Sequence, residues 1–168
     1  QPVRVHDDVT LRFLPAGHIL GAAFIEMRLE KAGADGSDRT IVFSGDLGRL
    51  RQPIVPDPAL LPPCDHLLLE STYGNRDHAD GDPKDRLAEL VKETVGRGGT
   101  LLIPSFAVGR TQHLLYLFRE LEREGRFPRD VPIWMDSPMA IEATKVTLDH
   151  PEAQDGAMRS APCNVVPW

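Results

Sequence analysis

The fold is first indicated by residues 40–49, whose sequence is TIVFSGDLGR. Thr40–Phe43 is β-branched and apolar, which is typical of a short buried strand. The following turn places a single carboxylate, Asp46, between two glycines, and small residues let a backbone turn sharply and approach a ligand. This stretch predicts a buried strand that ends in a loop carrying a functional carboxylate. The alternative is that Asp46 only caps a turn.

The same arrangement occurs on both sides of this stretch. GHILG, residues 17–21, follows the apolar run Val9–Leu14, and ESTYGNR, residues 70–76, follows His66–Leu69. A His, an Asp and a Glu therefore stand at successive strand ends, as in metal or hydrolytic sites that are built from loops on a rigid sheet.

His18, Asp46 and Glu70 are the candidate site residues of these loops. Histidine nitrogen and carboxylate oxygen are zinc ligands, so His18 and Asp46 could share a metal, although both need further partners. We expect their side chains to converge from neighbouring strand ends. The alternative is that His18 has a structural role. A carboxylate such as Glu70 at the edge of a buried strand is costly unless it is paired or bound to a metal.

The second half of the chain changes character after a boundary near residues 77–83. Apolar residues at the helical period predict helices over Lys84–Val95 and Gly109–Glu124, and Pro138 opens a third that runs to about Asp149. Short apolar runs at Thr100–Ile103 and Pro132–Met135 predict strands between them. Alternating strands and helices favour a parallel βαβ arrangement.

Two strand-to-helix turns in this half are candidate phosphate-binding elements. Pro104–Arg110, with the sequence PSFAVGR, should present free N–H groups at a helix start, and Arg110 adds a guanidinium that fits phosphate. The alternative is that Arg110 pairs with a carboxylate such as Glu70 or Asp136. Met135–Pro138 repeats the arrangement. Ser105, Arg110 and Ser137 are therefore the candidate phosphate-binding residues of these turns. His78 could also reach the site of the first half.

Composition limits the function classes. The 168 residues carry a formal net charge of −6, which argues against a broad basic surface for nucleic acid but leaves room for a local one. No apolar stretch approaches the ~18 residues of a membrane helix, so we expect no membrane partner. Cys64 and Cys163 form no ligand-spaced pair and indicate a reducing compartment, here the cytoplasm.

Taken together, the motifs resemble the β-CASP branch of the metallo-β-lactamase fold, which includes RNase J and the nuclease subunit of the messenger-RNA 3′-end cleavage factor. The resemblance spans about Val9 to Asp149. It rests on the motifs GHILG (17–21), SGDLG (44–48), ESTYGNR (70–76), PSFAVGR (104–110) and DSPMA (136–140), in the order of the family.

The resemblance implies an α/β chain with part of a metallo-β-lactamase αββα sandwich over residues 1–78. Part of a β-CASP domain with a parallel βαβ sheet follows over residues 79–168. It implies a zinc-dependent RNA phosphodiester hydrolase with two zinc ions in the complete enzyme. In that reading His18 is a zinc ligand, Asp46 bridges the two metals, and Glu70 is the acidic residue of the first β-CASP motif. The resemblance thus makes Asp46 and Glu70 the candidate catalytic residues. It also implies that the turns of the β-CASP domain bind RNA, here through Ser105, Arg110 and Ser137.

The departures from the family pattern bear on activity. The His-x-His-x-Asp-His motif of the family does not occur in these 168 residues. The chain begins at Gln1 and ends at Trp168, and we expect it to be an internal fragment that is inactive in isolation. The complete protein could form a homo-oligomer. The alternatives are a truncated or degenerate fragment that binds RNA or a partner without cleavage, and a metallo-hydrolase of the same superfold that acts on something other than nucleic acid.

Overall fold

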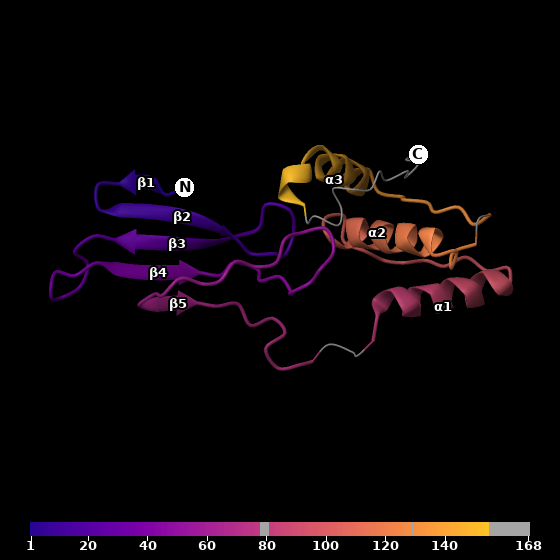
Figure 1. Ribbon diagram of the computed structural model, residues 1–168, viewed down its shortest axis with the longest axis horizontal. Coiled ribbons are helices and arrows are strands. Elements are labelled where there is room, and N and C mark those ends of the chain that lie inside the picture. Colours follow the sequence, from indigo (N-terminus) through magenta and orange to yellow (C-terminus); the bar gives the residue numbers. More distant parts are fainter. Residues whose placement is uncertain (78–80, 129, 155–168) are drawn as a thin grey trace. The chain divides into compact units, whose positions relative to one another are not determined.

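The computed structural model describes residues 1–77, 81–128 and 130–154 (Figure 1). Within it the chain divides into two compact units, the first covering Gln1–Asn75 and the second beginning at Arg76. Each unit has its own type of secondary structure, strands in the first and helices in the second. Each is therefore described by itself.

The first unit is built on one five-stranded sheet with the order β1-β2-β3-β4-β5. The first three pairs are antiparallel, whereas β4 and β5 are parallel. The strands are β1 (Val3–His6), β2 (Val9–Pro15), β3 (Ala23–Leu29), β4 (Arg39–Phe43) and β5 (His66–Leu68). Because β2 and β4 both run antiparallel to β3, the strands β2, β4 and β5 all end at the same edge of the sheet.

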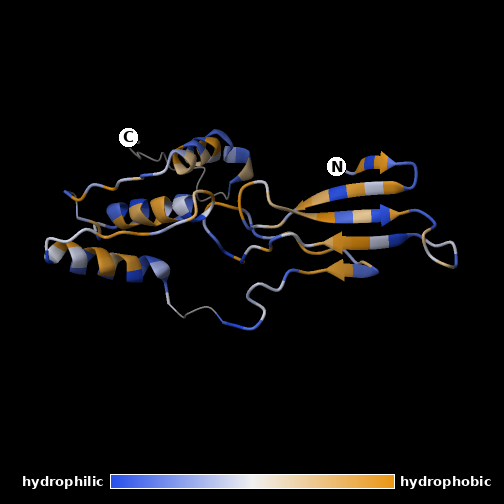
Figure 2. Ribbon diagram, turned by 180° about the vertical axis from the view of Figure 1, so that it is seen from behind, coloured by the Kyte–Doolittle hydropathy of each residue, from blue (hydrophilic) through white to orange (hydrophobic). Residues whose placement is uncertain are grey.

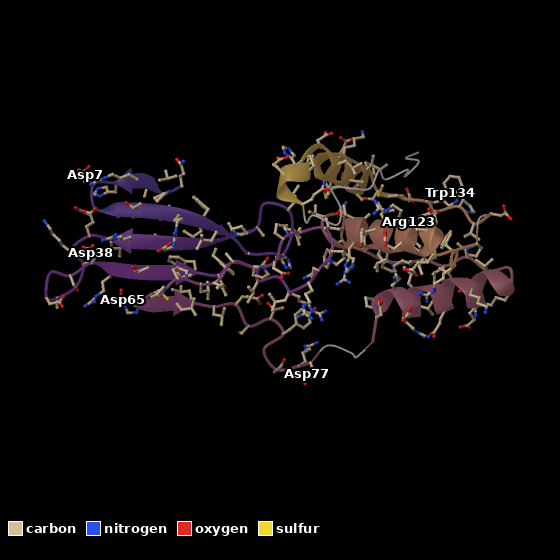
Figure 3. The ribbon with its side chains drawn as sticks, in the orientation of Figure 1. Asp7, Asp38, Asp65, Asp77, Arg123 and Trp134 are labelled. Atoms are coloured by element: carbon tan, nitrogen blue, oxygen red, sulfur yellow. The ribbon has the colours of Figure 1, made fainter. Side chains whose placement is uncertain are left out.

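Two aspartates fix the opposite ends of β4 and β5. Asp65 accepts a hydrogen bond from the Thr40 N–H at 2.7 Å, and the Asp65 N–H donates to the Thr40 carbonyl oxygen at 2.9 Å. Asp38 pairs with Arg28 at 2.6 Å. The Arg28 hydrogen bond holds the pKa of Asp38 below its usual range, and the Thr40 N–H does the same for Asp65. Figure 3 shows both aspartates at one end of the sheet, where they fix the register of the strands. The motif loops leave the sheet at its other end.

The second unit contains α1 (Pro83–Gly96), α2 (Arg110–Arg123), α3 (Pro138–Asp149) and a 3₁₀ turn at Pro151–Ala153. Asp82 caps α1 by accepting from the Lys84 N–H at 2.8 Å. Apolar and polar residues alternate around the helices (Figure 2), which gives α1 and α2 faces that can be buried. Those faces supply most of a core of six buried residues: Leu87, Val91, Leu117, Phe118, Leu121 and Phe127.

The predicted strands Thr100–Ile103 and Pro132–Met135 do not form in the described part of the second unit. The prediction of a parallel βαβ sheet is therefore wrong for these residues. Leu101, Val131 and Ile133 pack against the helical core instead. The apolar residues that indicated strands are thus buried against the helices, and this burial requires no neighbouring strand.

The sandwich implied for the first half stays a prediction, because the described residues of the first unit form one sheet and no helix. Among the described residues of the whole chain, no helix has both the length and the apolar character that a membrane crossing requires.

Candidate functional site

The three motif loops of the first unit leave one edge of its sheet. GHILG follows the end of β2, SGDLGR follows the end of β4, and ESTYGNR follows β5. The common direction of these three strands places the loops together, as their position after apolar runs predicted. One detail of that prediction is wrong: β2 and β4 are not neighbours, because β3 lies between them.

Ser44 joins the second loop to the third from a buried position. Its side chain is 1% exposed. The Ser44 N–H donates to the Leu68 carbonyl oxygen at 2.9 Å, which extends the β4–β5 pairing by one step. The hydroxyl oxygen accepts the Glu70 N–H at 3.0 Å and donates to the Gly45 carbonyl oxygen at 2.7 Å. Ser44 thereby fixes the starting points of both loops, a role that the sequence analysis did not identify.

The Glu70 carboxylate holds the Asp46 loop. One oxygen accepts the Leu47 N–H at 3.1 Å and the other accepts the Thr72 N–H at 3.0 Å. The hydrogen bonds from Thr72, then that from Leu47, and more weakly the charge of His18, hold the pKa of Glu70 below its usual value. Glu70 is therefore paired with backbone donors, which answers why an acidic residue is tolerated at the end of β5.

The first loop is packed directly against the second. The Gly48 N–H donates to the carbonyl oxygen of Ala16, which is fully buried, at 2.8 Å. A Cβ atom on Gly48 would lie 1.7 Å from the Gly17 carbonyl oxygen. Only glycine fits at this contact, so the close approach of the two loops explains why residue 48 is a glycine.

His18 and Asp46 are exposed on these two contacting loops. The convergence of their side chains stays a prediction, and so does their role as metal ligands. Among the described residues, no group of three or more His, Cys, Asp or Glu side chains could hold a metal ion. These residues therefore do not form a complete zinc centre by themselves. His78 lies outside the described residues.

Glu70 gives the first unit a predicted acid sensitivity. Because the pKa of Glu70 is lowered in the folded chain, its stabilising contribution is present above the pKa of an unfolded Glu, about 4.3, and is lost as the pH falls through the folded value. The free energy of unfolding is measured with urea at neutral pH and again below about pH 4. We expect it to fall more between the two pH values in the wild type than in Glu70→Gln. Glu30→Gln is the control, and an equal loss in Glu70→Gln and wild type would contradict the assignment.

The candidate RNA-binding turn of the second unit differs from expectation at its backbone. The Gly109 N–H donates to Gln112 Oε1 at 2.7 Å. The next two N–H groups donate to backbone carbonyl oxygens of the same turn, that of Arg110 to Val108 at 3.1 Å and that of Thr111 to Phe106 at 3.2 Å. The expectation of free N–H groups is therefore wrong for these three positions, because contacts within the turn already occupy them. Only side chains and any remaining donors could bind a phosphate here.

The Arg110 side chain is available for such a contact. It is exposed and forms no ion pair with Asp136 or with any other described carboxylate of its unit. Ser105 is also exposed, and its hydroxyl oxygen accepts from Thr111 Oγ1 at 3.3 Å. Ser137 caps α3 by accepting the Ala140 N–H at 3.2 Å. RNA binding by these three residues stays a prediction.

The comparisons with known proteins agree with the motifs. Residues 111–166 match the Beta-Casp domain. The chain is 43% identical over 134 residues to "Ribonuclease TTHA0252" of Thermus thermophilus, which covers 79% of this chain and 28% of that protein. It is 36% identical over 157 residues to "Transcription termination factor FttA" of Methanosarcina mazei, covering 90% of this chain and 23% of that protein.

A third relative is the "RNase J-like protein" of Methanocaldococcus jannaschii, which is 33% identical over 153 residues. That match covers 88% of this chain and 34% of the relative. The chain thus spans between 23% and 34% of the length of these three relatives. The ordered motifs, the Beta-Casp match and these relatives together show that the chain belongs to the β-CASP branch of the metallo-β-lactamase-fold ribonuclease family.

Proposed function

We propose that this chain contributes to a zinc-dependent RNA phosphodiester hydrolase. The observation that carries the proposal is the joining of three motif loops at one sheet edge, through Ser44, Glu70 and Gly48. The relatives named as ribonucleases support RNA as the substrate. A cytoplasmic location and self-association of the complete protein are part of the same proposal.

Each loop residue has a separate role in this proposal. His18 and Asp46 are metal ligands, and Asp46 and Glu70 form the catalytic group. Glu70 is a positioning residue, because its carboxylate accepts the Leu47 N–H beside Asp46 and thereby fixes the orientation of that loop. The described residues do not complete a zinc centre, so a bound zinc ion would need further ligands besides His18 and Asp46.

RNA cleavage by the complete protein tests the proposal. We expect Asp46→Asn to abolish cleavage of a labelled single-stranded RNA. Asp7→Asn, which changes an exposed aspartate at the other end of the sheet (Figure 3), should leave cleavage unchanged. RNA binding without cleavage by the wild-type protein would favour the non-catalytic alternative. Cleavage of a different ester without RNA binding would favour another hydrolase of the superfold.

Zinc uptake by the 168-residue chain is predicted to be weak. His18 and Asp46 are two ligands, whereas complete catalytic zinc sites use about three protein ligands per ion. Isothermal titration should show no tight, stoichiometric binding, and His18→Ala should remove the weak binding that is seen. Tight stoichiometric uptake by this chain would contradict the prediction.

Arg110→Ala is predicted to weaken RNA binding by the complete protein. Losing one phosphate contact should reduce the slope of log affinity against log salt by about 0.7, the value per phosphate of a single strand. Affinity should fall roughly 3- to 10-fold at low salt, consistent with about 1 kcal/mol for one contact. Arg97→Ala, at the end of α1, is the control. A lower melting temperature with an unchanged salt slope would make Arg110 a structural residue.

A further inference from the structure

The turn before α2 contains an unusual backbone geometry. Gly109 has φ 82° and ψ −69°, and the Arg110 N–H donates back to the Val108 carbonyl oxygen at 3.1 Å. These are the dihedrals and the hydrogen bond of a γ-turn of the rare form with positive φ, which is strained. The backbone of Arg110 therefore starts from a conformation that the surrounding structure has to hold.

A buried side-chain amide provides that support. Gln112 is 5% exposed. Its Oε1 accepts the Gly109 N–H at 2.7 Å, and its Nε2 donates to the Ala107 carbonyl oxygen at 3.0 Å. The amide thus binds the backbone of the turn at two positions, on both sides of Val108. Both contacts are part-buried, because the Gln112 amide is buried while Ala107 and Gly109 are half-buried, so losing the amide leaves two backbone groups of the turn without their partner.

The same amide connects the turn to α3, which packs beside α2 (Figure 1). Gln112 Nε2 also donates to Thr144 Oγ1 at 2.9 Å, and Thr144 Oγ1 donates to the Ala140 carbonyl oxygen at 2.7 Å. The Ala140 N–H in turn donates to the Ser137 hydroxyl at 3.2 Å. A continuous path of hydrogen-bonded groups therefore runs from the turn that carries Arg110 to the cap that carries Ser137.

We propose that Gln112 is a positioning residue for RNA binding, which holds Arg110 in the geometry that contacts a phosphate and fixes the Arg110 turn relative to the start of α3. The inference rests on the proposed function of Arg110. The N–H groups of residues 109–111 form hydrogen bonds inside the turn. The phosphate contact therefore depends on the Arg110 side chain, whose position is set by the backbone of residue 110. A relaxed γ-turn would move that starting point, and a small displacement weakens an oriented charge contact.

The test compares Gln112→Met with Arg110→Ala in the complete protein. Methionine has a similar length and no amide, so it leaves the turn without its support. The matched control is Gln154→Met, because Gln154 is also buried at 4% exposure and donates from its amide to the Thr147 carbonyl oxygen. Binding of a fluorescein-labelled oligouridylate is measured over a series of salt concentrations, together with the melting temperature of each variant.

We expect Gln112→Met to reduce the salt slope by the same amount as Arg110→Ala, about 0.7. Gln154→Met should lower the melting temperature comparably and leave the slope unchanged. In the Arg110→Ala background, Gln112→Met should cause no further loss of affinity, because both substitutions remove the same contact. Thr144→Val, which keeps the two contacts to the turn and breaks the link to α3, should give a smaller change in the same direction.

The outcomes separate the two proposals. An unchanged salt slope in Arg110→Ala would overturn the proposed phosphate contact. A reduced slope in Arg110→Ala with a wild-type slope in Gln112→Met would overturn the positioning role alone. If Gln112→Met does not fold, Thr144→Val decides: a wild-type slope there rejects the coupling to α3, and additive losses in the double variant with Arg110→Ala reject action through Arg110.

Discussion

Gly48→Ala should unfold or severely destabilise the first unit, and with it separate the two loops that carry His18 and Asp46. The new Cβ atom would lie 1.7 Å from the carbonyl oxygen of Gly17 and 2.6 Å from the backbone nitrogen of His18. Backbone atoms cannot swing away as a flexible side chain can. We therefore expect a loss in the free energy of unfolding at or above the upper end of the ~1–3 kcal/mol typical of overpacking.

Urea unfolding followed by circular dichroism measures this loss, with Gly96→Ala as the matched control. Gly96 lies at the end of α1, and a Cβ atom there meets nothing within 4 Å. That variant should be neutral or gain up to about 1 kcal/mol, since alanine favours helix more than glycine does. A Gly48→Ala protein as stable as wild type, with RNA cleavage retained in the complete protein, would show that the loops need not touch.

Hydrophobic pattern was sufficient to predict much of the sheet and the first two helices, and a proline predicted the third. Val9–Leu14 and Thr40–Phe43 were expected as strands and lie within β2 and β4. Pro138 was expected at the start of a helix and opens α3. These predictions succeeded because local periodicity, proline and capping residues act within a few positions along the chain. The three loops were expected together from their position after apolar runs, and the common direction of β2, β4 and β5 in the structure explains that placement.

Contacts between distant positions were beyond sequence reasoning. Ser44 and Glu70 are 26 residues apart, and Gln112 and Thr144 are 32 apart. Nothing in local periodicity says that one serine hydroxyl is buried and paired. A partial signal for Gln112 was present, because glutamine at the third helical position is one half of a capping box, whose other half the N-cap residue Gly109 lacks a side chain to supply. Its further bond to Thr144 depends on the packing of α2 against α3.

In both units a buried polar side chain holds the backbone that carries an exposed candidate residue. In the first, buried Ser44 fixes the base of the loop that carries exposed Asp46. In the second, buried Gln112 fixes the turn that carries exposed Arg110. A charged side chain that must meet a ligand cannot itself be packed, so its orientation has to come from polar groups beneath it. Substituting Ser44 or Gln112 therefore tests how the exposed residue is oriented, when ligand binding is measured together with stability.

Leu121→Ala is expected to cost the second unit about 2–5 kcal/mol, the usual range for truncating a buried leucine. Leu121 is 0% exposed and belongs to the core formed by α1, α2 and Phe127. Phe118 and Phe127 meet edge to face in the same core, with ring centres 5.5 Å apart. These rings are large and rigid, so they would close only part of the space that the lost methyl groups leave. Chemical denaturation measures the change.

Two leucine variants make the result specific to this core. Leu102→Ala removes the same atoms from a side chain that is 82% exposed, so it should change stability by no more than about 0.5 kcal/mol. Leu121→Met keeps the volume and should cost less than about 1.5 kcal/mol. Equal losses in Leu121→Ala and Leu102→Ala would mean that Leu121 is not at the centre of a packed core. The helix that carries Arg110 and Gln112 would then be held by contacts other than its apolar face.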